Sequence, residues 1–349
     1  MDYTKSQSNY NNFAYDLLET SVSPIGDYLS SPLSVFLLLT TLFGSGGVKG
    51  NTQVQIGDVL GIDNVKGKQK IATQLFTSLY HNLTEENVDF TLQEDAKRTI
   101  NGWVSNKTNK LIPEFLKQSL SKQTILALVN TLYFKGRWRK PFSKRSTADR
   151  DFKPANQPVI KVPMMYITET MDYGKFPHFR VHMISKQFSN PRFTFVVILP
   201  IETGNIEFAE EVLRGYVQLP ILMKQLQPTE ISLGLPRFKL ESSIDLVESL
   251  KIMGITDLFN PNLANLTGIT DAKVHADVLR QSSLLKVNEE GVEAAAATAI
   301  SIELTSVRGF QPIRFNVNES FVCFIYDTIL ETALFAGRVI KPVSLSESK

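Results

Sequence analysis

The chain has 349 residues, with 37 basic against 35 acidic side chains and a formal net charge of +2. So small a net charge excludes recruitment of nucleic acid by the surface as a whole, and a hydrophobic fraction of 43% excludes general disorder. The single cysteine, Cys323, excludes an intramolecular disulfide, and its place in an apolar run predicts a small buried side chain.

Helical patterns dominate the first third of the chain. Apolar residues recur at three- and four-residue spacing over 12–20, 34–42 and 93–104, which predicts three helices. Ser31 is placed to cap the second of these helices, and Pro32 suits its first turn. We therefore expect this helix to begin at residue 32.

Neither a membrane span nor a secretion signal is predicted. The longest apolar stretch, 35–43, falls well short of the roughly 20 residues that a bilayer span needs. The polar residues 1–12 lack the apolar core of a signal peptide.

Strand patterns follow in the middle and at the end of the chain. The nearly continuous apolar run over 125–134 predicts a strand buried on both faces, and 193–199 predicts another. The runs 321–326 and 333–340 are separated by a short polar segment, which predicts a hairpin. No linker divides the chain, so we predict one α+β domain over 1–349, with helices grouped early and large sheets later.

Patterns for catalysis and metal binding are weak. His178 and His182 lie four residues apart, but Pro177 argues against a regular helix and no third ligand completes a zinc pattern. The glycine-rich residues 44–50 lack the Gly-Lys-Ser/Thr of a phosphate loop. No Gly-x-Ser-x-Gly nucleophile motif is present. We expect no enzyme, no metal site and no obligatory cofactor.

Residues 288–305 carry two conflicting patterns. Four consecutive alanines over 294–297 favour a helix. Read with a period of two, the even positions from Val292 to Leu304 form an apolar face, which favours a strand with one buried side. Gly291 supplies a hinge, and the small side chains after it would let the segment slip between existing strands. An ordinary helix end and a loop that later becomes a strand both remain open.

The same segment resembles the hinge of the serpins. Similar motifs follow in the family's order at 130–138, 235–239 and 335–339, and the resemblance spans roughly residues 12–342. The hinge-like residues are Glu289, Glu290, Gly291, Val292, Glu293, Ala294, Ala295, Ala296, Ala297 and Thr298.

The resemblance implies the serpin fold, in which helices pack on a large central β-sheet with two further sheets and an exposed reactive-centre loop, here at about 289–314. It also implies a suicide inhibitor of serine proteases. The protease attacks the loop as a substrate, a covalent acyl complex forms, and the cleaved loop inserts into the main sheet. The expected partner is a target serine protease, and the chain is expected to be a monomer that binds no nucleic acid. A non-inhibitory carrier, chaperone or protease substrate with the same fold is the alternative.

The scissile bond is placed less sharply than the hinge. Counting forward from Gly291 with the family's usual spacing gives an earlier bond than counting back from Phe315, so the loop is about two residues longer than usual. Arginine pairs bidentately with the carboxylate in the specificity pocket of trypsin-like proteases, which favours Arg308. The predicted bond joins Arg308 to Gly309, and the alternatives are the bond from Thr305 to Ser306 and a cut after Val307.

A basic stretch over 135–153 is a candidate site for a sulfated polysaccharide, with a solvated basic loop as the alternative. An arginine bait suits proteases that act outside cells, so we expect an extracellular or cell-surface protein, with the cytoplasm as the alternative. Residues 60–88 look short against the family, either because the helical region is reduced or because residues are absent. The candidate polyanion residues are Lys135, Arg137, Arg139, Lys140, Lys144 and Arg145.

Overall fold

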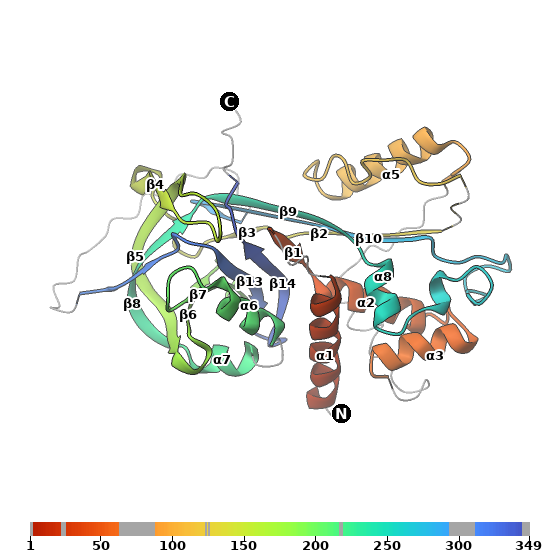
Figure 1. Cartoon of the computed structure of the whole chain (residues 1–349), viewed down its shortest axis with the longest axis horizontal. Coiled ribbons are helices and arrows are strands. Elements are labelled where there is room, and N and C mark those ends of the chain that lie inside the picture. Colours follow the sequence, from red (N-terminus) through yellow and green to blue (C-terminus); the bar gives the residue numbers. More distant parts are fainter. Residues whose placement is uncertain are drawn as a thin grey trace. The chain divides into compact units, whose positions relative to one another are not determined.

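The computed structural model describes residues 3–21, 26–62, 88–122, 124, 126–215, 219–292 and 311–343. The short region at 60–88 lies almost entirely outside these residues. The chain divides into two compact units: Met1–Val22, Ser30–Tyr133 and Ser242–Ser283 form the first, and Ser23–Leu29, Phe134–Glu241 and Leu284–Lys349 form the second. The prediction of one domain over the whole chain stays a prediction. Figure 1 traces the elements from α1 in red to β14 in blue.

Helices make up most of the first unit, and the three predicted ones are confirmed. Ser31 caps α2 as expected, because its hydroxyl accepts a hydrogen bond from the Ser34 amide at 3.4 Å and Pro32 is the first helical residue. The helices are α1 (Tyr3–Ser21), α2 (Pro32–Gly44), α3 (Gly50–Val59), α5 (Gln93–Lys107), α8 (Val247–Ile252) and the 3₁₀ helix η4 (Asp257–Phe259).

A hydrophobic core joins α1, α2, α3, α8 and η4 of the first unit. Each of these helices contributes apolar side chains from one face, which is thereby removed from water. The core includes Phe13 and Leu17 of α1, Val35 and Leu39 of α2, Ile56 of α3 and Leu250 of α8.

A five-stranded sheet contains β2 (Ala127–Tyr133), β3 (Gly136–Arg137), β9 (Phe238–Asp245), β10 (Val278–Asn288) and β11 (Gly291–Val292). Its order is β2-β10-β11-β3, and β9 also pairs with β10. The strand expected at 125–134 is β2, but the prediction that both its faces are buried is wrong, since only Asn130 is buried. Apolar residues favour a half-buried pleated surface as well as a fully buried one.

The second unit is built mainly on a nine-stranded sheet. Its order is β1 (Tyr28–Ser30), β14 (Thr332–Val339), β13 (Phe321–Asp327), β7 (Phe193–Pro200), β6 (Val181–Gln187), β5 (Ile160–Phe176), β8 (Gln227–Pro236) and β12 (Ile313–Asn316), with β4 (Thr147–Phe152) also on β5. The predicted hairpin is the antiparallel pair β13 and β14. All seven residues of β13 are buried, which explains its unbroken apolar run.

Helices also occur late in the chain, where the sequence predicted mainly sheets. In the second unit α6 (Ile206–Arg214) packs against β7 and β13, and α7 (Leu219–Gln225) follows it (Figure 1). Short 3₁₀ turns occur at η1 (Lys144–Ser146) and η2 (Pro177–Phe179). Cys323 is buried as predicted, and burial raises the pKa of its thiol. Among the helices of the described residues, none is long and apolar enough to cross a membrane.

Candidate functional site

The hinge predicted from sequence begins as a tight turn between two paired strands. β10 ends at Asn288, residues 289–290 form the turn, and β11 returns antiparallel, with Gly291 opposite Asn288 and Val292 opposite Val287. The Asn288 side-chain oxygen accepts hydrogen bonds from the amides of Glu290 and Gly291 at 3.0 and 3.1 Å. A side chain that bonds its own following backbone in this way fixes the turn locally.

Glycine is required at position 291 because another backbone approaches it closely. β11 also pairs with β3, with Gly291 opposite Arg137 and Val292 opposite Gly136. A Cβ atom on Gly291 would lie 2.1 Å from the carbonyl oxygen of Gly136, and the φ of Gly291 is 154°. Only a residue without Cβ fits here, so glycine at the predicted hinge is what allows this strand pairing.

Trp138 holds the turn from the side. Its backbone amide donates to the carbonyl of Glu290 at 3.0 Å, and its indole Nε1 donates to the carbonyl of Asn288 at 2.9 Å. The indole stacks on Phe188 with ring centroids 4.8 Å apart. The Phe142 amide adds a third bond, 2.8 Å to the carbonyl of Glu289. The turn is therefore bonded through three successive carbonyls, and its position depends on where the aromatic ring lies.

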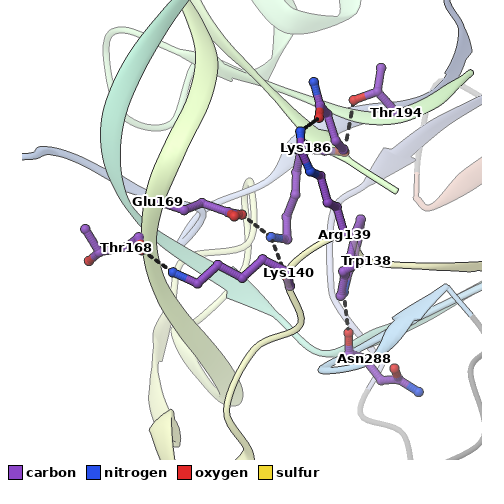
Figure 2. A network of polar contacts seen from close by, with 9 residues as sticks. Trp138, Arg139, Lys140, Thr168, Glu169, Lys186, Thr194 and Asn288 are labelled. Carbon is purple, nitrogen blue, oxygen red and sulfur yellow. Dashed lines mark hydrogen bonds and ion pairs between the residues drawn. The ribbon is translucent and has the colours of Figure 1, made fainter. Parts of the chain in front are cut away.

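An ion pair between the buried Lys186 and the partly buried Glu169 lies near this aromatic ring, as Figure 2 shows. Lys186 of β6 is 1% exposed and bonds the carboxylate of Glu169 on β5 and the carbonyl of Lys140. Its ammonium lies 5.4 Å from the ring centre of Trp138 and 4.9 Å from that of Phe142. Burial lowers the pKa of Lys186, and Glu169 opposes this shift. The ion pair holds the Lys186 ammonium close to the rings of Trp138 and Phe142, the two residues whose amides bond the turn.

The two glutamates of the turn, Glu289 and Glu290, contact different partners. Glu289 is buried, and its carboxylate accepts a hydrogen bond from the Thr147 hydroxyl at 2.8 Å. An Arg237 nitrogen lies 3.8 Å from the same carboxylate. Glu290 pairs with Lys144 at 3.3 Å. Glu289 thus contacts two elements that are far away in the sequence, while Glu290 contacts an exposed lysine.

The first four predicted hinge residues, Glu289 to Val292, lie together at this site. The rest of the predicted hinge and every candidate for the scissile bond lie outside the described residues. Those positions are Glu293, Ala294, Ala295, Ala296, Ala297 and Thr298 of the hinge, and Thr305, Ser306, Val307, Arg308 and Gly309 of the bond.

Sequence reasoning missed the residues that support the turn. Lys186 carried a usable signal: it follows Ile184 and precedes Phe188 at two-residue spacing, so a charge occupies an inward position of a strand. For Asn288 and Thr147 the sequence carries no signal of their role apart from the residue type itself.

Histidines do not form a metal site in this part of the chain. His178 lies in the η2 turn and His182 in strand β6, so they share no helix face. Across the described residues, no three or more His, Cys, Asp and Glu side chains are grouped to hold a metal ion. The site holds the first two residues of a strand, Gly291 and Val292, in a fixed position between β10 and β3.

In the first unit, β10 has β2 as a direct neighbour. Near the start of β10 the Asp277 amide donates to the Leu126 carbonyl at 3.0 Å, and the Leu126 amide donates to the Asp277 carboxylate at 3.3 Å. β11 pairs instead with the last two residues of β10.

Comparisons with known proteins identify the family of the chain. A family model described as Serpin (serine protease inhibitor) matches residues 74–342. The leukocyte elastase inhibitor of Equus caballus is 30% identical over 95% of this chain and 97% of that protein, and alaserpin of Manduca sexta is 34% identical over 74% and 65%. A solved serpin from the trematode Schistosoma haematobium has a TM-score of 0.85 and 30% identity, covering 97% of this chain and 100% of that one. The chain belongs to the serpin family and has its fold.

Proposed function

We propose that this chain inhibits serine proteases as a suicide substrate and is not itself an enzyme. The observation that carries the proposal is the start of the predicted hinge, where Gly291 and Val292 already form a strand between β10 and β3. Val292 is fully buried there, so the first residue of the apolar face predicted from the sequence points inward. A strand that has begun beside β10 is a start point for insertion.

The proposed reaction begins with ordinary proteolysis. The serine oxygen of the protease attacks the carbonyl carbon of the residue before the cut, and the peptide C–N bond breaks. The new amino terminus leaves with the proton that the serine gave up. The protease stays joined by an ester to the loop segment that begins at β11.

Insertion would then extend β11 along β10. By strand alternation from the buried Val292, residues Ile300, Ile302 and Leu304 would face the same side. Burying each of these side chains contributes about 1.5–3 kcal/mol. Glu293 and Glu303 fall on the other face, so no charge is forced inward.

The target is proposed to be a trypsin-like protease, because Arg308 suits a specificity pocket that holds a carboxylate. A relative is named for the inhibition of elastase, which makes an elastase the first rival target. Because such trypsin-like proteases act outside cells, we propose an extracellular or cell-surface location, with the cytoplasm as the alternative.

The test is incubation with trypsin, elastase and chymotrypsin, followed by denaturing gel electrophoresis and mass spectrometry of the released peptide. We expect a trypsin complex that survives denaturation and a peptide that begins at Gly309. Arg308→Gln should abolish the trypsin complex. Arg314→Gln, an exposed arginine in β12, is the matched control and should leave it unchanged.

The possible results distinguish the proposals on the scissile bond, the protease specificity and inhibition itself. A peptide beginning at Ser306 would move the bond to Thr305, and a complex with elastase alone would overturn trypsin-like specificity. Cleavage by all three proteases without any stable complex would overturn inhibition. It would favour the non-inhibitory carrier, chaperone or substrate.

A further inference from the structure

An open cavity of about 510 Å³ lies in the second unit, where strands β5 and β6 meet the segment that follows β3. A cavity of this size fits a small organic molecule, which a few well-placed polar groups orient. Its lining includes charged, polar and apolar side chains, among them Arg139, Met171, Asp172, Ser185, Gln187 and Pro228.

One part of the lining accepts hydrogen bonds and donates none. Asp172 of β5 lies directly opposite Ser185 of β6 in the antiparallel ladder, so their side chains share one face. The Thr194 hydroxyl donates its only proton to the carbonyl of Lys186 at 2.9 Å. The 2.6 Å bond between Ser185 and Thr194 therefore uses the Ser185 proton, and the Ser185 oxygen keeps lone pairs for a further donor. A carboxylate and a hydroxyl acceptor side by side suit an ammonium group.

The charge of Asp172 is not compensated. Within the described residues its carboxylate forms no hydrogen bond and no ion pair. The side chain is half-buried, and this burial raises the pKa of its carboxyl. Partial removal of an unpaired carboxylate from water costs free energy, which a bound cation would offset.

A second part of the lining supplies hydrogen-bond donors. The Arg139 guanidinium donates to the side-chain oxygen of Gln187 at 2.7 Å, which leaves the Gln187 amide group as a donor. Lys140 adds another positive charge to the lining. Glu169 does not cancel these charges, because the buried ammonium of Lys186 already pairs with it (Figure 2). This part of the cavity suits a carboxylate.

Strand β6 sets the spacing of the two parts. Ser185 and Gln187 are alternate residues of this strand, so they lie on one side of it about 6.6 Å apart. Met171 and Pro228 line the same cavity and offer apolar contacts. The cavity therefore combines acceptors, donors at a fixed distance from them, and an apolar surface.

We propose that this cavity binds a linear zwitterion of the ω-amino acid class. Its ammonium group would lie at Asp172 and Ser185, and its carboxylate at Arg139 and Gln187. An aliphatic chain of matching length would join the two and contact the apolar lining. A simple carboxylate would leave Asp172 without a cation, and a simple amine would leave the donors without an anion. The proposal does not depend on protease inhibition.

The test is calorimetric titration with 6-aminohexanoate, whose charged groups are joined by an extended chain of suitable length. Hexanoate and hexylamine each lack one of the two charged groups and are the matched control ligands. We expect saturable binding of 6-aminohexanoate that is roughly tenfold or more tighter than that of either control, because each control loses the hydrogen bonds of one charged group.

Two variants assign the ends of the ligand. D172N should abolish the preference for 6-aminohexanoate over hexanoate, and R139Q should abolish the preference over hexylamine. D149N and R150Q make the same charge changes on the exposed strand β4 and should bind like the wild type. D172N should unfold at the same or a higher temperature, because it removes an uncompensated charge, so misfolding cannot imitate the expected loss.

Fluorescence identifies the place of binding. The chain has two tryptophans, so Trp103→Phe leaves Trp138, which directly precedes Arg139, as the only reporter. Its emission should change with the same Kd as in the calorimetric titration. No saturable binding at millimolar ligand, hexanoate binding as tightly as 6-aminohexanoate, equal affinity losses in D172N and D149N, or binding without a change in emission would each overturn the proposal.

Discussion

The two ends of the predicted bait loop are held in different ways. At the hinge, β11 is antiparallel to both β10 and β3, and the Trp138 amide, Trp138 indole and Phe142 amide bond the turn before it. At the far end, β12 pairs in parallel with β8, its partner among the described strands. Only Phe315 of its four residues is buried.

This difference indicates which substitutions should destabilise each end of the loop. The hinge depends on backbone geometry and on several hydrogen bonds, so truncating one side chain, such as Trp138, removes only part of its support. The far end is an edge strand with a parallel ladder, whose pairing is slightly weaker per residue. Its attachment depends mainly on one buried ring, which lies 4.6 Å from the His182 ring and 6.4 Å from the Tyr173 ring. Changes at the two ends should therefore have separable effects.

The largest effect is expected for Phe315→Ala. Removing a fully buried aromatic side chain costs about 3–5 kcal/mol. Hydrogen exchange should become faster in β12 and the adjoining β8, while the amides of Trp138 and Phe142 at the hinge stay protected. Ile313→Ala, on the same strand but 41% exposed, is the control and should change stability by less than about 0.5 kcal/mol. Equal stability losses in the two variants would contradict the dependence on one ring.

The next largest effect is expected for Gly291→Ala, which attacks the other end. The new Cβ would collide with the Gly136 carbonyl, and such overpacking costs about 1–3 kcal/mol. Denaturant unfolding measures the loss. Gly102→Ala in α5 is the matched control: its Cβ would meet nothing within 4 Å, and a helix gains roughly 0.5–1 kcal/mol from this change. A stable Gly291→Ala protein with unchanged exchange at Trp138 would show that the β3 contact is not required.

A smaller effect is expected for Trp138→Phe, which keeps an aromatic ring but removes the indole donor. Losing this hydrogen bond to the Asn288 carbonyl costs about 0.5–1.5 kcal/mol. Trp103→Phe, in α5, serves as the control for the generic exchange of these side chains. Faster exchange of the Gly291 amide in the first variant alone would tie the indole to the hinge. No difference between the variants would remove Trp138 from that role.

The last effect is a pH dependence at the far end. Burial, together with the charge of Lys175 opposite in the β5–β6 ladder, lowers the pKa of His182 to about 4 from its ordinary value of 6.5. The unfolded chain therefore binds a proton more readily than the folded one between these values. Stability from the neutral imidazole is complete above pH 6.5 and is lost as the pH falls toward 4.

Thermal denaturation across this pH range measures the effect. His182→Gln should flatten the part of the stability profile between pH 6.5 and 4 that this residue contributes. His178→Gln, at an exposed position in η2, should leave the profile unchanged. A profile that keeps its slope in the first variant would assign the acid sensitivity to other groups.

Local patterns in the sequence predicted much of the fold. Ser31 and Pro32 begin α2 because capping depends on residues next to each other in the chain. The all-buried run in β13 and its return in β14 likewise follow from their own composition. The hinge glycine and the family motifs were also visible, since they lie in continuous stretches. The late helices α6 and α7 were missed because they are short, although Ile206, Ala209 and Val212 of α6 are buried and recur at three-residue spacing.

The sequence by itself determined the family and the order of most elements, because each depends on neighbouring residues, and the hinge stays a prediction beyond its first four residues. Only the tertiary structure decided that Lys186 pairs with Glu169 beneath Trp138, that Glu289 meets Thr147, and that Arg137 lies opposite Gly291. These contacts join strands whose register is set by the whole sheet, and a shift of one residue would turn every side chain to the other face. The contacts that support the turn before β11 therefore follow from strand register, which no local pattern specifies.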